Sequence, residues 1–281
     1  MRLILCAGVA PHTHIQRNLK DKMKKLFALL SLASSLFVFT GCSSYITPGS
    51  KADLQSFAPP NIQENFAVKP SLPFPAGIAA VHIQAPDYTN YHLRHHGGQY
   101  GSGNYTVIMT REVEDQAQFD RVATLPQVAG IATLNRLLIP ERLDNDRQIR
   151  EAVSRLQADL VFVYTFETAF YDRNVAKPLT YVTLGLSPTK KVTAVTTVSA
   201  LLLDTRTGYI YSAYEATERS ELTSSSWSSR ETADEARRGT EKRAFNKLID
   251  DVVTSWPRLL ERFDKKPQLA AAVENTSDTP R

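Results

Sequence analysis

The chain has 281 residues, with 33 lysines and arginines against 29 aspartates and glutamates, a formal net charge of +4. Six of these basic residues but only one acidic residue lie in positions 1–42, so the remainder holds 27 basic and 28 acidic residues. The basic balance belongs to the N-terminal segment, which removes the argument for nucleic-acid binding. The only cysteines, Cys6 and Cys42, both lie in this N-terminal segment. The rest of the chain has no cysteine, so we expect no disulfide there.

Residues 23–41 have the order of a secretory signal peptide: a basic cluster, an apolar run and then small residues. The apolar run, Leu26 to Phe39, is shorter than the ~20 residues that a permanent transmembrane helix needs. Because Met23 directly precedes two lysines, we expect translation to begin there. Residues 1–22 are then a misassigned start-site extension; the alternative is a genuine long N-terminal region.

The sequence Phe39-Thr40-Gly41-Cys42 resembles the bacterial lipobox, in which a small residue precedes the lipidated cysteine. This resemblance implies cleavage before Cys42 and attachment of a diacylglycerol to its thiol. The residue after the cysteine is Ser43 and not aspartate. In Gram-negative bacteria the resemblance then implies sorting to the inner leaflet of the outer membrane, with the domain facing the periplasm. One acyl chain gives only marginal membrane binding, whereas two or more hold a protein firmly.

Residues 42–76 are rich in Pro, Ser, Gln and Asn, and they predict a flexible, semi-extended tether between the lipid and a folded domain. The alternative is an arm packed over that domain, because Phe57, Phe66 and Phe74 need apolar surroundings. A single globular domain over 77–264 is long enough to bury its own core.

The first half of the domain predicts short strands and little helix. In chain order we expect a strand over 77–85, a polar loop over 87–104, a strand over 105–112 and a short helix over 114–122. The pattern over 128–139 fits either a strand or a helix, and its Ile and Leu content with the stop at Pro140 favours a strand.

A clearer unit follows. Either residue of the Asn-Asp pair at 145–146 can cap a helix, in which Ile149, Val153 and Leu156 form one apolar face. The next stretch, 159–172, is rich in β-branched and aromatic residues, and its first half is apolar on both faces. That pattern indicates a buried central strand. A helix that leads directly into such a strand is typical of an α/β fold.

The last part of the domain predicts a hairpin and a long helix. Residues 191–203 and 209–218 flank a turn in which Asp204 opens a type I turn and Gly208 supplies a positive φ. A further short β-like run is expected over 179–186 and a Ser-rich connection over 221–230. Apolar residues at helical spacing then predict an amphipathic helix over 245–263.

Pro257 lies inside this helical pattern, and we expect a kink or a break after Trp256. The polar tail over 265–281 is expected to be disordered. The predicted fold is therefore α/β (α+β): a mixed sheet covered by helices, including the C-terminal one, behind a flexible lipid tether.

The histidines of the mature chain gather in one window, at His82, His92, His95 and His96. The last three are weak candidates for a zinc or copper site, since imidazole is a common metal ligand. The window contains no cysteine, and we expect the histidines to lie in a loop and not on a helix face. His82 lies inside a predicted strand, where a core or edge position is the simpler interpretation. We therefore predict no metal site.

The sequence also lacks the motifs of phosphate-binding loops and of G-x-S-x-G hydrolases. The glycine-rich segment 97–103 is followed by a strand-like run, whereas phosphate-binding loops lead into a helix. No G-x-S-x-G motif is present. We expect no enzyme activity and no cofactor. Trp227, in the Ser-rich connection, is a weak candidate for contact with a partner.

The order of elements, with ADLVFVYTF and LLLDTRTGYIY behind a lipobox, resembles a group of bacterial envelope lipoproteins. The group includes the curli-secretion lipoprotein, the lipoprotein activators of penicillin-binding proteins and the amino-terminal domain of TolB. The resemblance covers roughly 77–263 and implies a small α/β domain that binds protein partners or assembles. It assigns no functional residue.

The expected function is that of a non-catalytic module that binds a partner or serves as a scaffold in the cell envelope, held to the membrane through lipid on Cys42. One alternative is a pore or secretion-channel subunit, with residues 191–218 extending into a membrane. A second is a periplasmic metal-binding protein. The oligomeric state and the identity of the partner are left open.

Overall fold

Three parallel strands form the centre of the fold. β1 (Ala76–Gln84) lies between β5 (Val128–Thr133) and β7 (Leu160–Asn174). The computed structural model describes residues 48, 50–58, 61–174, 190–224 and 229–264. Cys42, Trp227, the run over 179–186 and the tail over 265–281 lie outside these residues.

Helices cover both faces of the parallel strands. α4 (Gln116–Ala123) precedes β5 and packs with the even-numbered residues of β1, such as Ile78. α5 (Asp146–Ser154) connects β5 to β7 and packs with the odd-numbered residues, such as Val81. Because helices cover both faces of these strands, residues on both faces are apolar, as predicted for the first half of β7.

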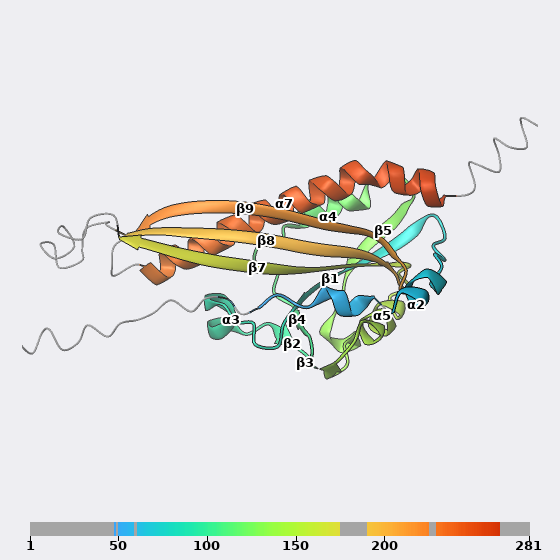
Figure 1. Cartoon of the computed structure of the whole chain (residues 1–281), viewed down its shortest axis with the longest axis horizontal. Helices are drawn as coiled ribbons and strands as arrows, with labels where there is room; N and C mark the ends of the chain where they lie inside the picture. The colour runs from blue at the N-terminus through green and yellow to red at the C-terminus, as the bar shows by residue number, and fades with distance from the viewer. Residues whose placement is uncertain (1–47, 49, 59–60, 175–189, 225–228, 265–281) are drawn as a thin grey trace, which may run out of the picture. The chain divides into compact units, whose positions relative to one another are not determined.

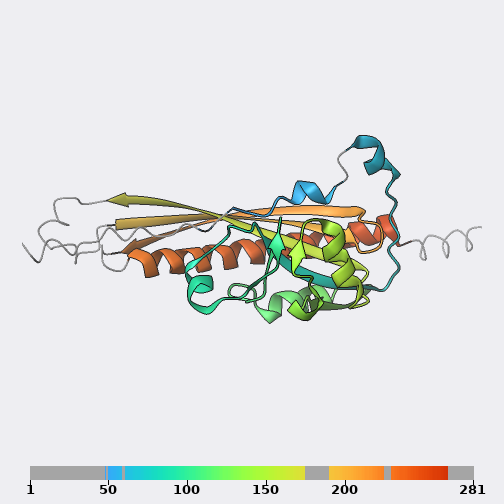
Figure 2. The ribbon, with the colours of Figure 1, turned by 90° about the horizontal axis from the view of Figure 1, so that it is seen from below.

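An antiparallel ribbon continues the sheet beyond β7. β8 (Lys190–Asp204) pairs with β7 and with β9 (Ile210–Ser224), and each of the three strands has 15 residues. α7 (Ser229–Phe263) runs lengthwise along one face of this ribbon (Figures 1 and 2). The sheet is therefore mixed, with helices packed on it, and the predicted α/β fold class is confirmed.

The predicted hairpin is confirmed at the turn between β8 and β9. Asp204 Oδ1 accepts from the amides of Arg206 and Thr207, at 2.9 and 3.1 Å. Gly208 has a φ of 75° and donates its amide to the Asp204 carbonyl. As predicted, the aspartate side chain accepts the turn amides and the glycine supplies the positive φ.

α7 begins earlier than predicted, and it is not broken at Pro257. It begins at Ser229 and not at 245, and β9 extends to Ser224, so the Ser-rich connection over 221–230 is wrong in its first and last residues. Pro257 does not end the helix. Trp256 is fully buried and donates its Nε1–H to the carbonyl of Pro126 at 2.8 Å, so packing holds the helix together at this proline.

The loop predicted over 87–104 contains regular structure. It forms α3 (Tyr91–His96), capped by Asn90, and the short strands β2 (Gln99–Tyr100) and β3 (Ser102–Gly103). β3 pairs with β6 (Arg142–Leu143). The sequence pattern missed these elements because each is too short to show a periodicity.

Two predicted strands are shorter than expected. β4 covers only Thr106–Ile108, where it pairs with β1 and β2. The strand predicted over 128–139 ends at Thr133 and is followed by η3 (Arg136–Leu138). Asn135 causes this change, because its side chain accepts the Leu137 amide and so begins a helical turn.

The described N-terminal segment packs on the sheet before it reaches β1. It forms η2 (Leu54–Phe57) and α2 (Ile62–Ala67). Ala52 and Phe57 are 1% and 3% exposed, and the Ala52 amide donates to Thr165 Oγ1 at 2.9 Å. From Ala52 to Phe57 the chain therefore has the arrangement of an arm packed over the domain. Among the described helices, none has the length and hydropathy needed to cross a membrane.

Candidate functional site

A pocket of about 220 Å³ opens at the point where β1 changes neighbours. On one edge, β1 pairs with β5 as far as Ala80 and then with β4 from Ile83. The pocket lies between these pairings, beyond Thr133 at the carboxyl end of β5. In open α/β sheets, ligands bind in crevices at the carboxyl ends of parallel strands, at the point where the helical crossovers change sides. The pocket occupies such a position.

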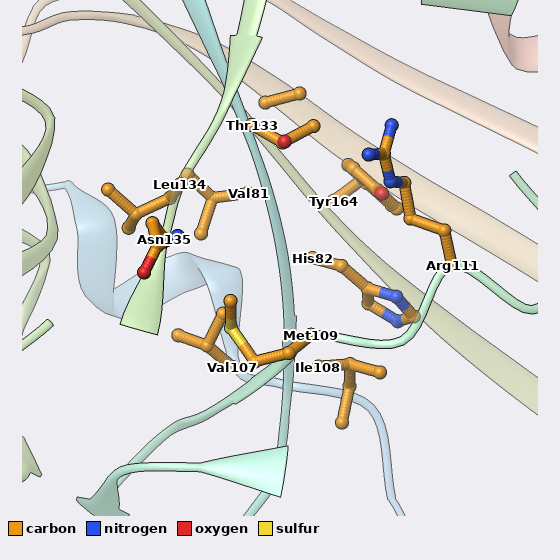
Figure 3. A pocket seen from close by; sticks show the side chains of 11 residues that line it. Val81, His82, Val107, Ile108, Met109, Arg111, Thr133, Leu134, Asn135 and Tyr164 are labelled. Carbon is orange, nitrogen blue, oxygen red and sulfur yellow. The ribbon is translucent and has the colours of Figure 1, made fainter. Parts of the chain in front are cut away.

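The wall of the pocket has a polar and an apolar side (Figure 3). His82, Arg111 and Tyr164 gather on one side, with Thr133 and Asn135 at the exposed rim. The remaining lining is mostly apolar and comes from β1, β4 and the segment after β5: Ala80, Val81, Val107, Ile108, Met109 and Leu134. A ligand with a charged or polar end and an apolar end would match this arrangement.

A buried carboxylate holds the polar side in place from behind. Glu114 is 5% exposed, and its Oε1 accepts from the Tyr164 hydroxyl at 2.9 Å and lies 2.9 Å from His82 Nδ1. Burial alone would raise the pKa of Glu114, but the interactions with His82 outweigh it and hold the pKa below its usual value.

The same network fixes the two rings that line the pocket. His82 stacks on Tyr164, with ring centroids 5.0 Å apart, and meets Phe166 edge-on at 5.0 Å. Its Nε2 lies 3.2 Å from the Gln84 side-chain nitrogen. Burial and the Glu114 carboxylate raise the pKa of Tyr164, so its hydroxyl stays protonated and donates to Glu114. These groups are engaged with one another and position the wall of the pocket. His82 lies in a strand as the sequence suggested, but it is only partly buried and lines the pocket.

A second buried polar cluster joins α7 to the sheet. Arg237 is 1% exposed, and its guanidinium lies 2.7 Å from Glu112, 2.9 Å from Asp234 and 2.6 Å from Glu241. Glu241 also accepts from the Thr168 hydroxyl at 3.0 Å. Burial raises the pKa of Glu241 even beside the arginine. Because the charged groups satisfy one another, we interpret this cluster as structural.

The histidine window differs from its prediction in secondary structure. α3 places His92 and His96 one turn apart, with ring centroids 4.7 Å apart, so the expectation of a loop without a helix face is wrong here. The Asn90 side chain, which accepts the Leu93 amide, is the capping signal that the sequence reasoning missed. The His95 side chain lies outside the described residues. In the part of the chain that the structure describes, no three metal-ligating side chains come together.

No protein-family model and no curated protein sequence matches this chain.

α2 presents an apolar surface to solvent. Ile62 and Phe66 are 74% and 78% exposed, and they lie one helical turn apart on the same face. No residue of α2 is buried, although surface helices normally turn their apolar face inward. The flanks of α2 are nevertheless fixed. Phe57 is in the core before it, and Ser71, after it, donates its amide to Asp204 at 2.8 Å.

Proposed function

We propose that this chain is an outer-membrane lipoprotein, anchored through lipid on Cys42, whose α/β domain binds a protein partner of the cell envelope without catalysis. The segment 23–42, with its signal-peptide order and lipobox-like end, supports the anchor. The α/β fold is compatible with the group of envelope lipoproteins that the sequence resembles.

The exposed apolar face of α2 is the observation that carries the partner-binding proposal. Two large apolar side chains at i and i+4 are the anchors that an amphipathic helix offers to a groove. Burying a Phe or Ile side chain contributes about 1.5–3 kcal/mol, a gain that α2 does not obtain within its own domain. A protein partner with a complementary groove would supply it.

The partner-binding claim can be tested by crosslinking in intact cells. We expect the double variant Ile62→Ser/Phe66→Ser to lose the crosslinked partner, while Gln63→Ser, on the same exposed helix, keeps it. The double variant should unfold at the same temperature as the wild type, because neither side chain is buried. A double variant that captures the partner as well as the wild type would contradict the proposal.

The anchor is tested separately. Cys42→Ser should move the protein from the membrane fraction to the soluble fraction, because the acyl chains can no longer be attached. The control is Ser43→Ala, which keeps the cysteine. A Cys42→Ser protein that remains in the membrane fraction refutes lipid anchoring and leaves the α2 experiment unaffected.

The alternative role of a pore or secretion-channel subunit would require a rearrangement of the fold. The even-numbered residues of β8, including Val192 and Ala194, pack against α7 and are 5% and 0% exposed. Insertion of residues 191–218 into a membrane would therefore require α7 to leave this face. Ring-shaped particles in electron micrographs of detergent-extracted protein would favour that role.

Metal analysis of the dialysed protein tests the metal-binding alternative.

A further inference from the structure

We propose that the pocket beside β1 binds a carboxylate carried on a short apolar group. This inference is independent of partner binding through α2, since the pocket lies at the split between β4 and β5 and shares no lining residue with α2. Its basis is the combination of a cation, polar groups at the rim and an apolar wall in one small cavity.

Arg111 supplies the cation. Its Nη1 donates to Gln116 Oε1 at 3.1 Å, and its Cζ lies 5.9 Å from the centre of the Phe119 ring. Among the described residues, no carboxylate forms an ion pair with it, in contrast to the fully paired Arg237. A guanidinium has five N–H donors in a planar fork that matches a carboxylate, so Arg111 retains donors for a ligand.

The rim at the carboxyl end of β5 supplies further polar groups. The Asn135 side-chain oxygen accepts the Leu137 amide, so the NH₂ group of Asn135 can donate to a ligand. Thr133 lines the pocket and is exposed. Thr133 is the last residue of β5, and Asn135 lies two residues beyond it as the cap of η3, so regular structure positions the backbone of both. They can bind the remaining polar atoms of a ligand that Arg111 holds by its carboxylate.

The apolar wall sets the other end of the ligand. Val107 and Leu134 are 2% and 5% exposed, and Met109 lies beside them in the lining (Figure 3). The Met109 thioether is flexible enough to adapt to a branched aliphatic group. At about 220 Å³, the cavity is smaller than the ~300–1,000 Å³ typical of sites for drug-sized molecules. The ligand is therefore small, or only the end of a larger molecule enters.

The nearest buried anion does not reach the pocket surface. Glu114 is held behind His82 and Tyr164 and is not part of the pocket lining. A carboxylate in the pocket would therefore meet the guanidinium of Arg111 and the rings of His82 and Tyr164, but not the Glu114 oxygens.

Two sources offer this chemistry: a free small carboxylic acid, or the C-terminal residue of a polypeptide. Calorimetric titration of the purified protein distinguishes them with N-acetyl-leucine and with a hexapeptide ending in leucine. We expect N-acetyl-leucine to bind and N-acetyl-leucinamide, which lacks the carboxylate, to bind at least tenfold more weakly. Tighter binding of the hexapeptide than of N-acetyl-leucine assigns a polypeptide terminus, and exclusion of the hexapeptide assigns a free acid.

Arg111→Gln should weaken binding of the carboxylate probe at least tenfold. Arg147→Gln, which changes an arginine that is 77% exposed on α5, should leave it unchanged. Because Arg111 is exposed, the variant should keep the melting temperature of the wild type, which separates lost binding from lost folding. The proposal is overturned if neither carboxylate probe binds at millimolar concentration, if the amide binds as well as the acid, or if Arg111→Gln binds like the wild type.

Discussion

Replacing Arg237 with methionine should lower the free energy of unfolding by about 3–5 kcal/mol, the range for breaking a buried ion pair. The guanidinium is 1% exposed, and the side chains of Glu112, Asp234 and Glu241 around it are 14%, 7% and 3% exposed. Burial alone would lower the pKa of Arg237, but these carboxylates reverse the effect and raise it. Methionine fills the space of the stem and leaves Glu241 without a cation, while Glu112 and Asp234 keep only the half-exposed Arg238.

The effect of this substitution should depend on pH. Burial already raises the pKa of Glu241, and loss of the guanidinium raises it further. A carboxyl group whose pKa is raised in the folded state favours folding below its unfolded pKa, and that contribution is lost as the pH rises. The deficit of Arg237→Met relative to the wild type should therefore be larger at pH 7 than at pH 4.5.

Urea denaturation followed by circular dichroism measures both effects, with Arg238→Met as the matched control. Arg238 is the next residue on α7 and contacts two of the same carboxylates, at 3.2 Å from Asp234 and 3.7 Å from Glu112. Its side chain is 51% exposed, so its loss should change the unfolding free energy by about 1 kcal/mol or less. Equal losses for the two variants, or a loss below about 1 kcal/mol for Arg237→Met, would show that the cluster is not a paired buried network.

Three further substitutions test other parts of the fold in the same assay. Gly208→Ala should destabilise the domain by about 1–2 kcal/mol, because Gly208 has a φ of 75°; a neutral effect would contradict the turn geometry. Burial alone would raise the pKa of Asp204, but hydrogen bonds from Ser71 and Tyr211 lower it. The ionised form thus stabilises the fold above about pH 4, and the difference between wild type and Asp204→Asn should shrink from pH 6 to pH 3; a constant difference would be inconsistent with this linkage. Trp256→Phe should lose about 1 kcal/mol with the hydrogen bond to the Pro126 carbonyl, and Trp256→Ala about 3–5 kcal/mol; similar losses for both would place the effect in the hydrogen bond alone.

Local patterns were sufficient to predict the α5–β7 unit and the β8–β9 hairpin. Ile149 and Val153 recur at helical spacing and are buried together, whereas Leu156, predicted on the same face, lies beyond the end of α5 at Ser154. The predicted cap is the Asn145 side chain, which accepts the Gln148 amide. In the hairpin, the turn chemistry of Asp204 and Gly208 is contained within five consecutive residues. Signals of this kind need no information about the rest of the chain.

The first half of α7 was missed for a physical reason. Its buried face contains Ala233 and Ala236 together with charged residues such as Arg237 and Glu241. An apolar periodicity does not detect a helix whose contact with the sheet is made by small side chains and by an internally paired charge cluster. The second half, with Phe245 and its neighbours in the core, has the expected stripe and was predicted.

The pocket could not be derived from the sequence at all. It exists because β1 pairs first with β5 and then with β4, so its wall combines His82, Arg111 and Asn135 from distant parts of the chain. None of these residues belongs to a motif, and His82 was predicted only as a strand residue. A site that depends on where two strands separate has no signal in residue spacing.

The attachment of the N-terminal segment to the sheet has a mechanical consequence. Ala52 donates to Thr165 in the middle of β7, and Ser71 and Leu72 donate to Asp204 and Tyr211 at the hairpin. Tension applied at the N-terminal end of this segment reaches the fold first through Ala52, at a central strand that is hydrogen-bonded along its length to β8. The hairpin contacts follow α2 along the chain, so the attachment at Ala52 shields α2 from a pull, and the hairpin contacts then shield β1.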